Sequence, residues 1–206
     1  MHQINIMALI REKIGIILLG AVFIATSSFV FLMMSQKKYK VETSYLIVQN
    51  QSGSQDFYTL SKSAEYLGKI LSEAVYSELF IDEVVKTQKV RTEFLPFERS
   101  EKLQYWSKLV MVSRSPEVGI FTVNVYNDNQ KDALTISQAI SDVLTIKNSL
   151  FRGDGQNVEV KILSGPIWRN NPSLASTMFV TISGFFSGLF LMLMIFYYKR
   201  MQSFSR

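Results

Sequence analysis

The residue types that usually carry enzyme chemistry are scarce in this 206-residue sequence. Its single histidine is His2, and it contains no cysteine, which excludes a thiolate nucleophile, a disulfide scaffold and a cysteine-based zinc site. A histidine-centred catalytic triad or metal cluster is not expected either, because one histidine near the start of the chain has no partner of its kind. We therefore predict no catalytic residue, no cofactor and no metal site.

Two short motifs could suggest chemistry, but each has a simpler structural explanation. Asp82 and Glu83 are adjacent acids, and nothing in the sequence places a further acid beside them, so we interpret them as an ordinary pair on a helix surface. The segment Arg152–Asp154 spells an adhesion tripeptide. The glycines in and after this tripeptide are typical of a turn between a helix and a strand, which explains it without adhesion.

Two long apolar runs dominate the two ends of the chain. Ile14 to Met34 gives 21 consecutive uncharged residues and Leu174 to Tyr198 gives 25, against the roughly 20 that a helix needs to cross a bilayer. The small residues at 25–27 resemble a signal-peptide cleavage site, but the first run is longer than the roughly 7–15 residues of a signal peptide, which favours a retained anchor. The predicted division is a tail at 1–13, a span at 14–34, a central domain at 35–173, a second span at 174–198 and a tail at 199–206.

The basic excess of the chain lies beside these two runs. The central segment 35–173 holds 17 basic and 16 acidic residues, so it is nearly neutral and nucleic acid is not an expected partner. The basic residues of the tails are Arg11, Lys13, Lys199, Arg200 and Arg206. The positive-inside rule then predicts that both termini are cytoplasmic and that the central domain lies outside the membrane. Three lysines at 37–40 oppose this orientation, but a loop this long is translocated largely regardless of its charge.

Hydrophobic periodicity in the central segment predicts a small α+β fold with a mixed sheet. The first predicted elements are a strand at 39–48, a helix that begins at 57 and ends between 76 and 86, and a helix at 96–106. They are followed by a hairpin of 109–113 with 118–126, a helix at 133–150 and a strand at 158–163. Asn127–Asn129 offers N-cap side chains for the last of these helices. We expect the first and last strands to pair, because each is tied to a membrane helix and their pairing would bring the two spans together.

The stretch between the last strand and the second span, Gly165 to Ser173, contains two of the four prolines, Pro166 and Pro172. Proline fixes φ near −65° and biases the preceding residue towards extended geometry. We therefore predict a stiff, extended connector through which neither a helix nor a regular strand continues.

Small residues in both apolar runs have the spacing of a helix-packing motif. Gly184 and Gly188 form a G-x-x-x-G pair in the second run, and Ala21 and Ala25 form a small-x-x-x-small pair in the first. Such spacing lets helix backbones approach closely, so we predict helix packing within or between subunits, although glycine is also common in membrane helices for no special reason. The aromatic residues expected as anchors at the membrane interface are Trp168, Tyr197 and Tyr198.

The order of these features resembles the chain-length determinant (Wzz-type) family of polysaccharide co-polymerases. The resemblance covers nearly the whole chain and is carried by a strand soon after the first span, a long amphipathic helix, the passage "FTVNVYNDNQKDALTISQAISDVL" and the ending "VEVKILSGPIWRNNPS". In that family a Pro-x-x-Pro-x-x-Pro stretch precedes the second span. Pro166 and Pro172 match its outer positions, and Arg169 stands at the middle one.

The resemblance implies a function that composition does not provide. Proteins of this family assemble into rings in the bacterial inner or plasma membrane and act with a polymerase or exporter to set the length of O-antigen, capsule or exopolysaccharide chains. Some work with a fused or separate tyrosine kinase. This chain has no G-x-x-x-x-G-K-[ST] loop, so a fused kinase is not expected and a separate one is a candidate partner. The expected partners are thus further copies of the chain, a polymerase or exporter, and membrane lipid.

Two other classes of membrane protein share this organisation. A receptor ectodomain also lies between two spans, but signalling needs a cytoplasmic output module and the short tails contain none. A structural subunit or adaptor of another envelope transport or kinase complex would look similar, and it stays as the alternative to the co-polymerase.

Overall fold

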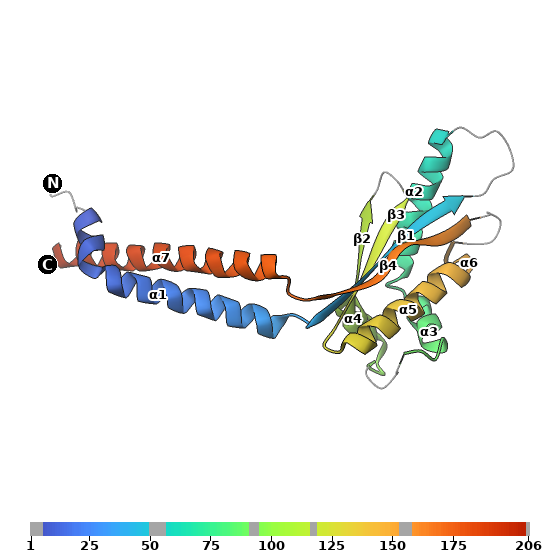
Figure 1. Ribbon diagram of the computed structural model, residues 1–206, viewed down its shortest axis with the longest axis horizontal. Coiled ribbons are helices and arrows are strands. Elements are labelled where there is room, and N and C mark those ends of the chain that lie inside the picture. The colour runs from blue at the N-terminus through green and yellow to red at the C-terminus, as the bar shows by residue number, and fades with distance from the viewer. Residues whose placement is uncertain (1–5, 50–56, 91–94, 116–118, 153–157, 205–206) are drawn as a thin grey trace. The chain divides into compact units, whose positions relative to one another are not determined.

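The computed structural model describes residues 6–49, 57–90, 95–115, 119–152 and 158–204. The chain divides into two compact units, and Figure 1 shows that the first and last helices of the chain belong to the same one. The helical unit consists of Met1–Gln36 and Pro172–Arg206, and the α+β unit consists of Lys37–Asn171. Each is described separately below.

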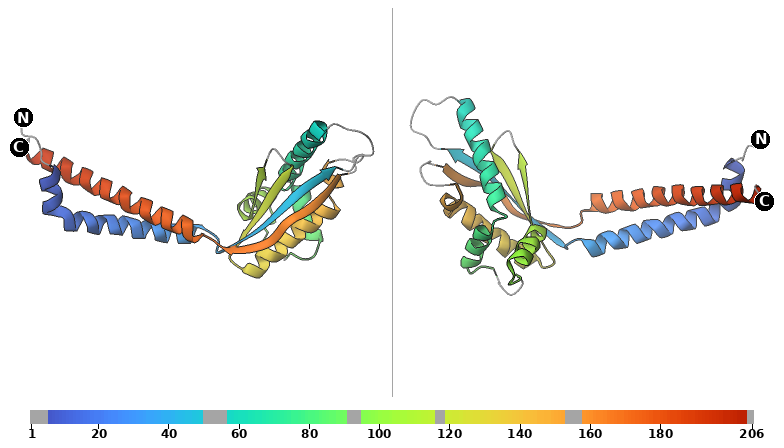
Figure 2. Two further views of the ribbon diagram at one scale, coloured as in Figure 1. Left: turned by 45° about the horizontal axis from the view of Figure 1, so that its top comes forward. Right: turned by 180° about the vertical axis from the view of Figure 1, so that it is seen from behind.

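The helical unit is built from two long helices, α1 (Ile6–Ser35) and α7 (Leu174–Phe204). Both are long and apolar enough to cross a membrane, over the spans Arg11–Ser35 and Leu174–Gln202. At about 1.5 Å per residue, even the shorter span of 25 residues exceeds the roughly 30 Å of a bilayer core. The helices run side by side (Figures 1 and 2). Most of their large apolar side chains are exposed. The two predicted apolar helices are therefore present.

The α+β unit contains one four-stranded sheet. Its strands are β1 (Tyr39–Gln49), β2 (Val110–Ser115), β3 (Ile120–Asn127) and β4 (Val158–Asn170), in the spatial order β2-β3-β1-β4. All three neighbouring pairs are antiparallel, so the prediction of a mixed sheet was wrong. The predicted hairpin is confirmed as β2 with β3, and the predicted pairing of the first and last strands is confirmed as β1 with β4.

The predicted helix from 57 towards 86 is two helices, α2 (Phe57–Ala74) and α3 (Glu78–Lys86). Ser77 interrupts it: its backbone is extended, and its hydroxyl accepts a hydrogen bond from the Phe80 N–H at 3.2 Å. This is N-cap geometry, which starts a new helix. The carbonyl of Val75 at the break accepts a hydrogen bond from the Trp106 indole at 2.9 Å, so a distant element stabilises the interruption.

The remaining helices differ from the prediction at their ends. α4 (Arg99–Leu109) begins three residues after Pro96, which was expected in its first turn. α5 (Gln130–Ile146) begins after Asn129, whose side chain accepts a hydrogen bond from the Lys131 N–H at 2.9 Å, so the predicted asparagine cap is confirmed. α5 ends at Ile146 rather than near residue 150, and a separate turn, α6 (Ser149–Arg152), follows it.

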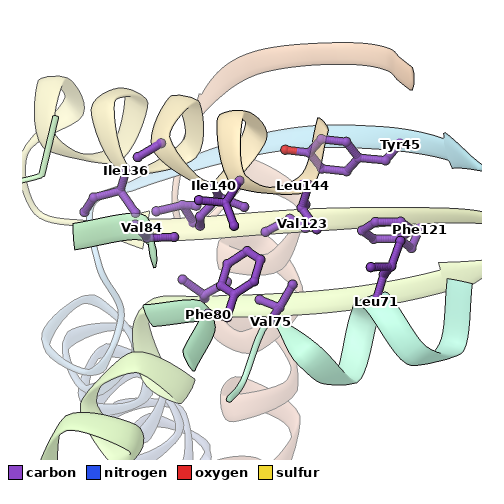
Figure 3. Packing of buried hydrophobic residues seen from close by; sticks show 14 of the residues in the cluster. Tyr45, Leu71, Val75, Phe80, Val84, Phe121, Val123, Ile136, Ile140 and Leu144 are labelled. Carbon is purple, nitrogen blue, oxygen red and sulfur yellow. The ribbon is translucent and has the colours of Figure 1, made fainter. Parts of the chain in front are cut away.

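The core lies on one face of the sheet, where α2, α4 and α5 contact the strands and α3 packs against α4 and α5. Alternate residues of β1 are buried, as its sequence pattern predicted, and in Figure 3 the side chains of α2 and α5 converge on those of β1 and β3. The Tyr45 and Phe121 rings stack there with their centroids 5.2 Å apart. The largest fully buried side chains are Trp106, Tyr45, Phe80, Phe121 and Leu71.

Two buried hydrogen bonds fix the position of α5 over β1. Thr43 Oγ1 lies 2.9 Å from Ser137 Oγ, and the Tyr45 hydroxyl lies 2.7 Å from Ser141 Oγ. Burial raises the pKa of Tyr45 to about 12, so the side chain stays neutral at any physiological pH. Because buried polar groups are costly without partners, only one registration of α5 on β1 satisfies all four.

β4 contradicts the prediction that no strand continues through the proline stretch. The strand runs through Pro166 to Asn170, opposite β1, with register shifts around Ser44. Gly165 adopts a φ of +111°, and a Cβ there would lie 2.5 Å from the Glu42 carbonyl oxygen, so glycine is required at this bulge. Proline is compatible with β4 because an edge strand has one side without a partner strand.

Candidate functional site: the packed helices and the last strand

Several acidic side chains of the α+β unit form ion pairs with lysines. Among the described residues, no group of three or more histidine, cysteine or acidic side chains could hold a metal ion. Glu83 is not a surface residue as predicted, because only 9% of its side chain is exposed and it bridges Lys147 at 2.7 Å and Lys86 at 2.6 Å. Hydrogen bonds from these two lysines lower the pKa of Glu83. Asp82 pairs with Lys102 at 3.1 Å.

Several residues of interest lie outside the described part of the chain. They are His2, Arg206 and the last two residues of the tripeptide Arg152–Asp154. Arg152 itself belongs to α6, where its Nε donates to Asn148 Oδ1 at 2.7 Å.

The structure brings the four small residues of the two apolar helices together. Ala21 and Ala25 of α1 are buried, and Gly188 and Gly184 of α7 lie against them. A Cβ on Gly188 would lie 2.8 Å from Ala21 Cα, and a Cβ on Gly184 would lie 3.3 Å from Ala25 Cα. These distances leave no room for a side chain, so the glycines permit close approach of the two backbones within one chain.

The contact between α1 and α7 at Ala21, Ala25, Gly184 and Gly188 forms a seam. The sequence analysis missed two further residues of this seam, Ser28 and Gly20. A Cβ on Gly184 would lie 2.8 Å from the hydroxyl oxygen of Ser28. Gly20 lies against the side chain of Met192. A signal for Ser28 was available, because it continues the spacing of Ala21 and Ala25 along one helix face. Nothing in the sequence pairs Gly20 with Met192, which is on the other helix.

The three residues of the predicted proline connector lie in different units. Pro166 and Arg169 belong to β4, where Arg169 lies opposite Lys40, whereas Pro172 belongs to the helical unit. Asn171, between Arg169 and Pro172, makes the last hydrogen bonds of this end of the sheet. Its backbone N–H donates to the Lys38 carbonyl at 2.8 Å and its side-chain amide donates to the Lys37 carbonyl at 2.8 Å.

The second apolar helix begins immediately after these hydrogen bonds. Ser173 Oγ accepts a hydrogen bond from the Ser176 N–H at 3.2 Å, which is the geometry of an N-cap. A single residue, Pro172, thus separates the hydrogen-bonded end of the sheet at Asn171 from the cap of α7. Proline restricts that one link further, because its φ is fixed.

The three predicted interface aromatics also divide between the units. Trp168 lies in β4 opposite Val41 and is 48% exposed, and Tyr197 and Tyr198 are exposed on α7. Aromatic rings that carry a polar group suit the headgroup layer of a membrane. The exposure of these three residues is compatible with the predicted role as interface anchors, which stays a prediction.

Comparison with known proteins adds no relative to this description. No protein-family model matches the chain, and no curated protein is significantly similar to it. A functional assignment has to rest on the sequence resemblance and on the geometry.

Proposed function

We propose that this chain is a non-enzymatic, two-pass membrane scaffold that regulates the chain length or export of a surface polysaccharide, as its resemblance to the chain-length determinant family implies. It acts as an oligomeric co-polymerase for O-antigen, capsule or exopolysaccharide. Its partners are further copies of itself, a polymerase or exporter and membrane lipid, with a separate tyrosine kinase as a further candidate.

The pairing of β1 with β4 is the observation that best supports this proposal. The two strands are hydrogen-bonded from Tyr39 opposite Asn170 to Gln49 opposite Val158. α1 ends at Ser35, just before β1, and α7 begins at Leu174, just after β4. A domain whose adjacent strands lead directly into two apolar helices of membrane-spanning length has the connection that a repeated structural unit of a membrane assembly needs.

Deletion of the gene tests the function directly. We expect the surface polysaccharide of the deletion strain to lose its preferred length on a gel, and the plasmid-borne gene to restore it. An unchanged length distribution would contradict the co-polymerase assignment and favour the alternative, a subunit of another envelope complex.

The proposed location is the bacterial inner or plasma membrane, with both termini in the cytoplasm. The basic residues Arg11, Lys13, Lys199 and Arg200 beside the two spans support this orientation. A reporter that works only outside the membrane should be active when fused after Gly155 and silent when fused after Arg206. Activity of the second fusion would contradict the two-pass topology.

Oligomerisation can be measured on the purified protein. A structural unit becomes useful in an assembly when a closed symmetry repeats it. We expect a high-order oligomer in mild detergent by light scattering. A monomer in several detergents would count against the co-polymerase.

The link at Pro172 suggests how the α+β unit and the membrane helices act together. We propose that the short, proline-restricted connection couples subunit packing in the α+β unit to subunit packing in the helical unit. Pro172→Ala restores backbone freedom at this link and leaves both cores intact, whereas Pro166 lies inside β4. Pro172→Ala should shift or broaden the polysaccharide length distribution at normal expression, and Pro96→Ala, outside the connection, should not. Equal distributions in both variants would remove support for the coupling.

A further inference from the structure

A cavity of about 770 Å³ lies between α2 and the β2–β3 hairpin. In Figure 2, α2 passes beside the strands of this hairpin. The volume is in the range of roughly 300–1,000 Å³ that small-molecule sites occupy. The lining residues are Lys62, Glu65, Tyr66, Gly68, Lys69, Val112, Arg114, Ser115, Gly119 and Ile120.

Two of the lining residues are glycines at the contact between α2 and the hairpin. Gly119 has a φ of +62°, and a Cβ there would lie 2.9 Å from the Cβ of Ala64 on α2. A Cβ on Gly68 of α2 would lie 3.9 Å from Gly119 Cα, so helix and hairpin approach closely at this point. The Gly119 carbonyl accepts a hydrogen bond from the Ile47 N–H at 3.1 Å, which fixes this wall to the central strand β1.

The side chains around the cavity carry a local excess of positive charge. Three lining residues are basic and one is acidic, whereas the segment 35–173 as a whole holds 17 basic and 16 acidic residues. Lys62 pairs with Glu65 at 2.8 Å, and Arg114 makes only a long contact of 3.6 Å with the exposed Glu73. Lys69 forms no ion pair with any residue in the described part of the chain. Lys69 and Arg114 therefore hold positive charge that the protein itself neutralises poorly.

An aromatic ring completes the lining. Tyr66 lies on α2 among the lining residues and is 65% exposed. An exposed tyrosine presents an apolar ring face together with a hydroxyl that donates and accepts hydrogen bonds. A ligand with a ring and an anionic group can use both the tyrosine and the cations.

We propose that this cavity binds an anionic sugar residue, with Lys69 and Arg114 holding its carboxylate or phosphate and Tyr66 packing against its ring. The inference rests on the proposed function, since it assigns the class of glycan that the scaffold contacts. The ligand charge is the chemistry that the site recognises, and the two possible sources of that charge are separated by the experiment below.

The test uses the full-length protein in detergent and three hexasaccharides in titration calorimetry. Hexagalacturonate carries carboxylates, 6-phosphorylated maltohexaose carries phosphates, and maltohexaose is neutral. We expect at least one anionic hexasaccharide to bind about tenfold or more tightly than maltohexaose, because each charge-assisted contact is lost in the neutral sugar. The tighter of the two anionic probes identifies the charge. Its affinity should fall as salt is added.

Variants locate the binding. Lys69→Gln with Arg114→Gln should weaken the anionic hexasaccharide about tenfold or more, and the matched control, Lys108→Gln with Lys131→Gln, removes the same charge elsewhere and should not. Tyr66→Leu should weaken binding about three- to tenfold without changing its salt dependence. Equal binding of the neutral sugar, no binding of either anionic sugar, or an unaffected Lys69/Arg114 variant would each overturn the proposal.

The outcome is independent of the test of the proposed function. If deletion of the gene alters polysaccharide length but the cavity binds no anionic sugar, only the cavity assignment is wrong. If deletion leaves the length unchanged, the co-polymerase is wrong whatever the calorimetry gives.

Discussion

The interiors of the two units are packed in opposite ways. The interior of the α+β unit contains large side chains such as Trp106, Phe80 and Phe121, whereas the closest backbone contacts between the helices of the helical unit are at alanine, serine and glycine. For a domain folding in water, removal of apolar area from water is the main driving force. Between helices in lipid that driving force is absent, and association depends on close contact between backbones.

This difference determines which substitutions each unit can tolerate. A core of large side chains is damaged by shortening, because a cavity forms and buried area is lost. A seam of small residues is damaged by enlargement, because the backbones have to separate. The following predictions test this contrast, beginning with the largest expected effect.

The two tryptophans provide the sharpest test in the α+β unit. Trp106 is fully buried and donates to the Val75 carbonyl, so Trp106→Ala should reduce the free energy of unfolding by about 3–5 kcal/mol. Trp168→Ala, at a half-exposed site, should cost below about 1.5 kcal/mol. Denaturation of the full chain in detergent, followed by circular dichroism, measures both. Equal losses would mean that the core does not have the packing described here.

In the helical unit the damaging change is enlargement. Gly184→Leu with Gly188→Leu should separate α1 from α7, at a cost of about 1–3 kcal/mol per site. Ser183→Leu with Ser187→Leu is the matched control, because these exposed serines have the same four-residue spacing.

The separation can be read from a disulfide in this cysteine-free chain. Gly20→Cys with Met192→Cys places two thiols at a position where a Cβ on Gly20 would lie 2.8 Å from Met192 Cγ. Oxidation should link the pair efficiently in the parent and in the serine control, and poorly in the glycine variant. Efficient linkage in all three would contradict the seam.

The sequence predicted those features that depend on local chemistry. The alternation of apolar and polar residues predicted β1, and the turn residues predicted the β2–β3 hairpin. The cap residue Asn129 predicted the start of α5. The small residues Ala21 and Gly188 were predicted to pack because spacing on a single helix suffices to recognise such a motif.

Features that depend on tertiary contacts were missed. The break at Ser77 lies within a continuous apolar period, and Trp106 on another helix stabilises it. Pro166 could join a strand only because β4 lies at the edge of the sheet, which no local pattern indicates. The basic cavity combines Lys69 with Arg114, which are far apart in the chain and are brought together by the packing of α2 on the hairpin.

Within the α+β unit, a smaller effect is expected from the buried hydroxyls. Tyr45→Phe removes the hydrogen bond to Ser141, and Ser141 keeps its own bond to the Ser137 carbonyl at 2.9 Å. We expect a loss of about 0.5–1.5 kcal/mol in the free energy of unfolding. Ser44→Ala, which breaks a half-buried pair with Thr122 on the other face, should cost less. A larger loss for Ser44→Ala would show that the buried contacts do not stabilise α5 on β1.

The smallest effect concerns Glu83 and depends on pH. Hydrogen bonds from Lys147 and Lys86 lower the pKa of this carboxyl in the folded protein, so its contribution to stability is complete above the pKa of the unfolded state and disappears as pH falls through the folded pKa. Glu83→Gln should therefore be less stable than the parent at neutral pH, and the two denaturation curves should converge in acid. Glu101→Gln, on the exposed side of α4, provides the control and should show no such convergence. A constant difference between Glu83→Gln and the parent from neutral pH into acid would mean that the charge of Glu83 contributes nothing, and that its buried side chain stabilises the α+β unit through packing alone.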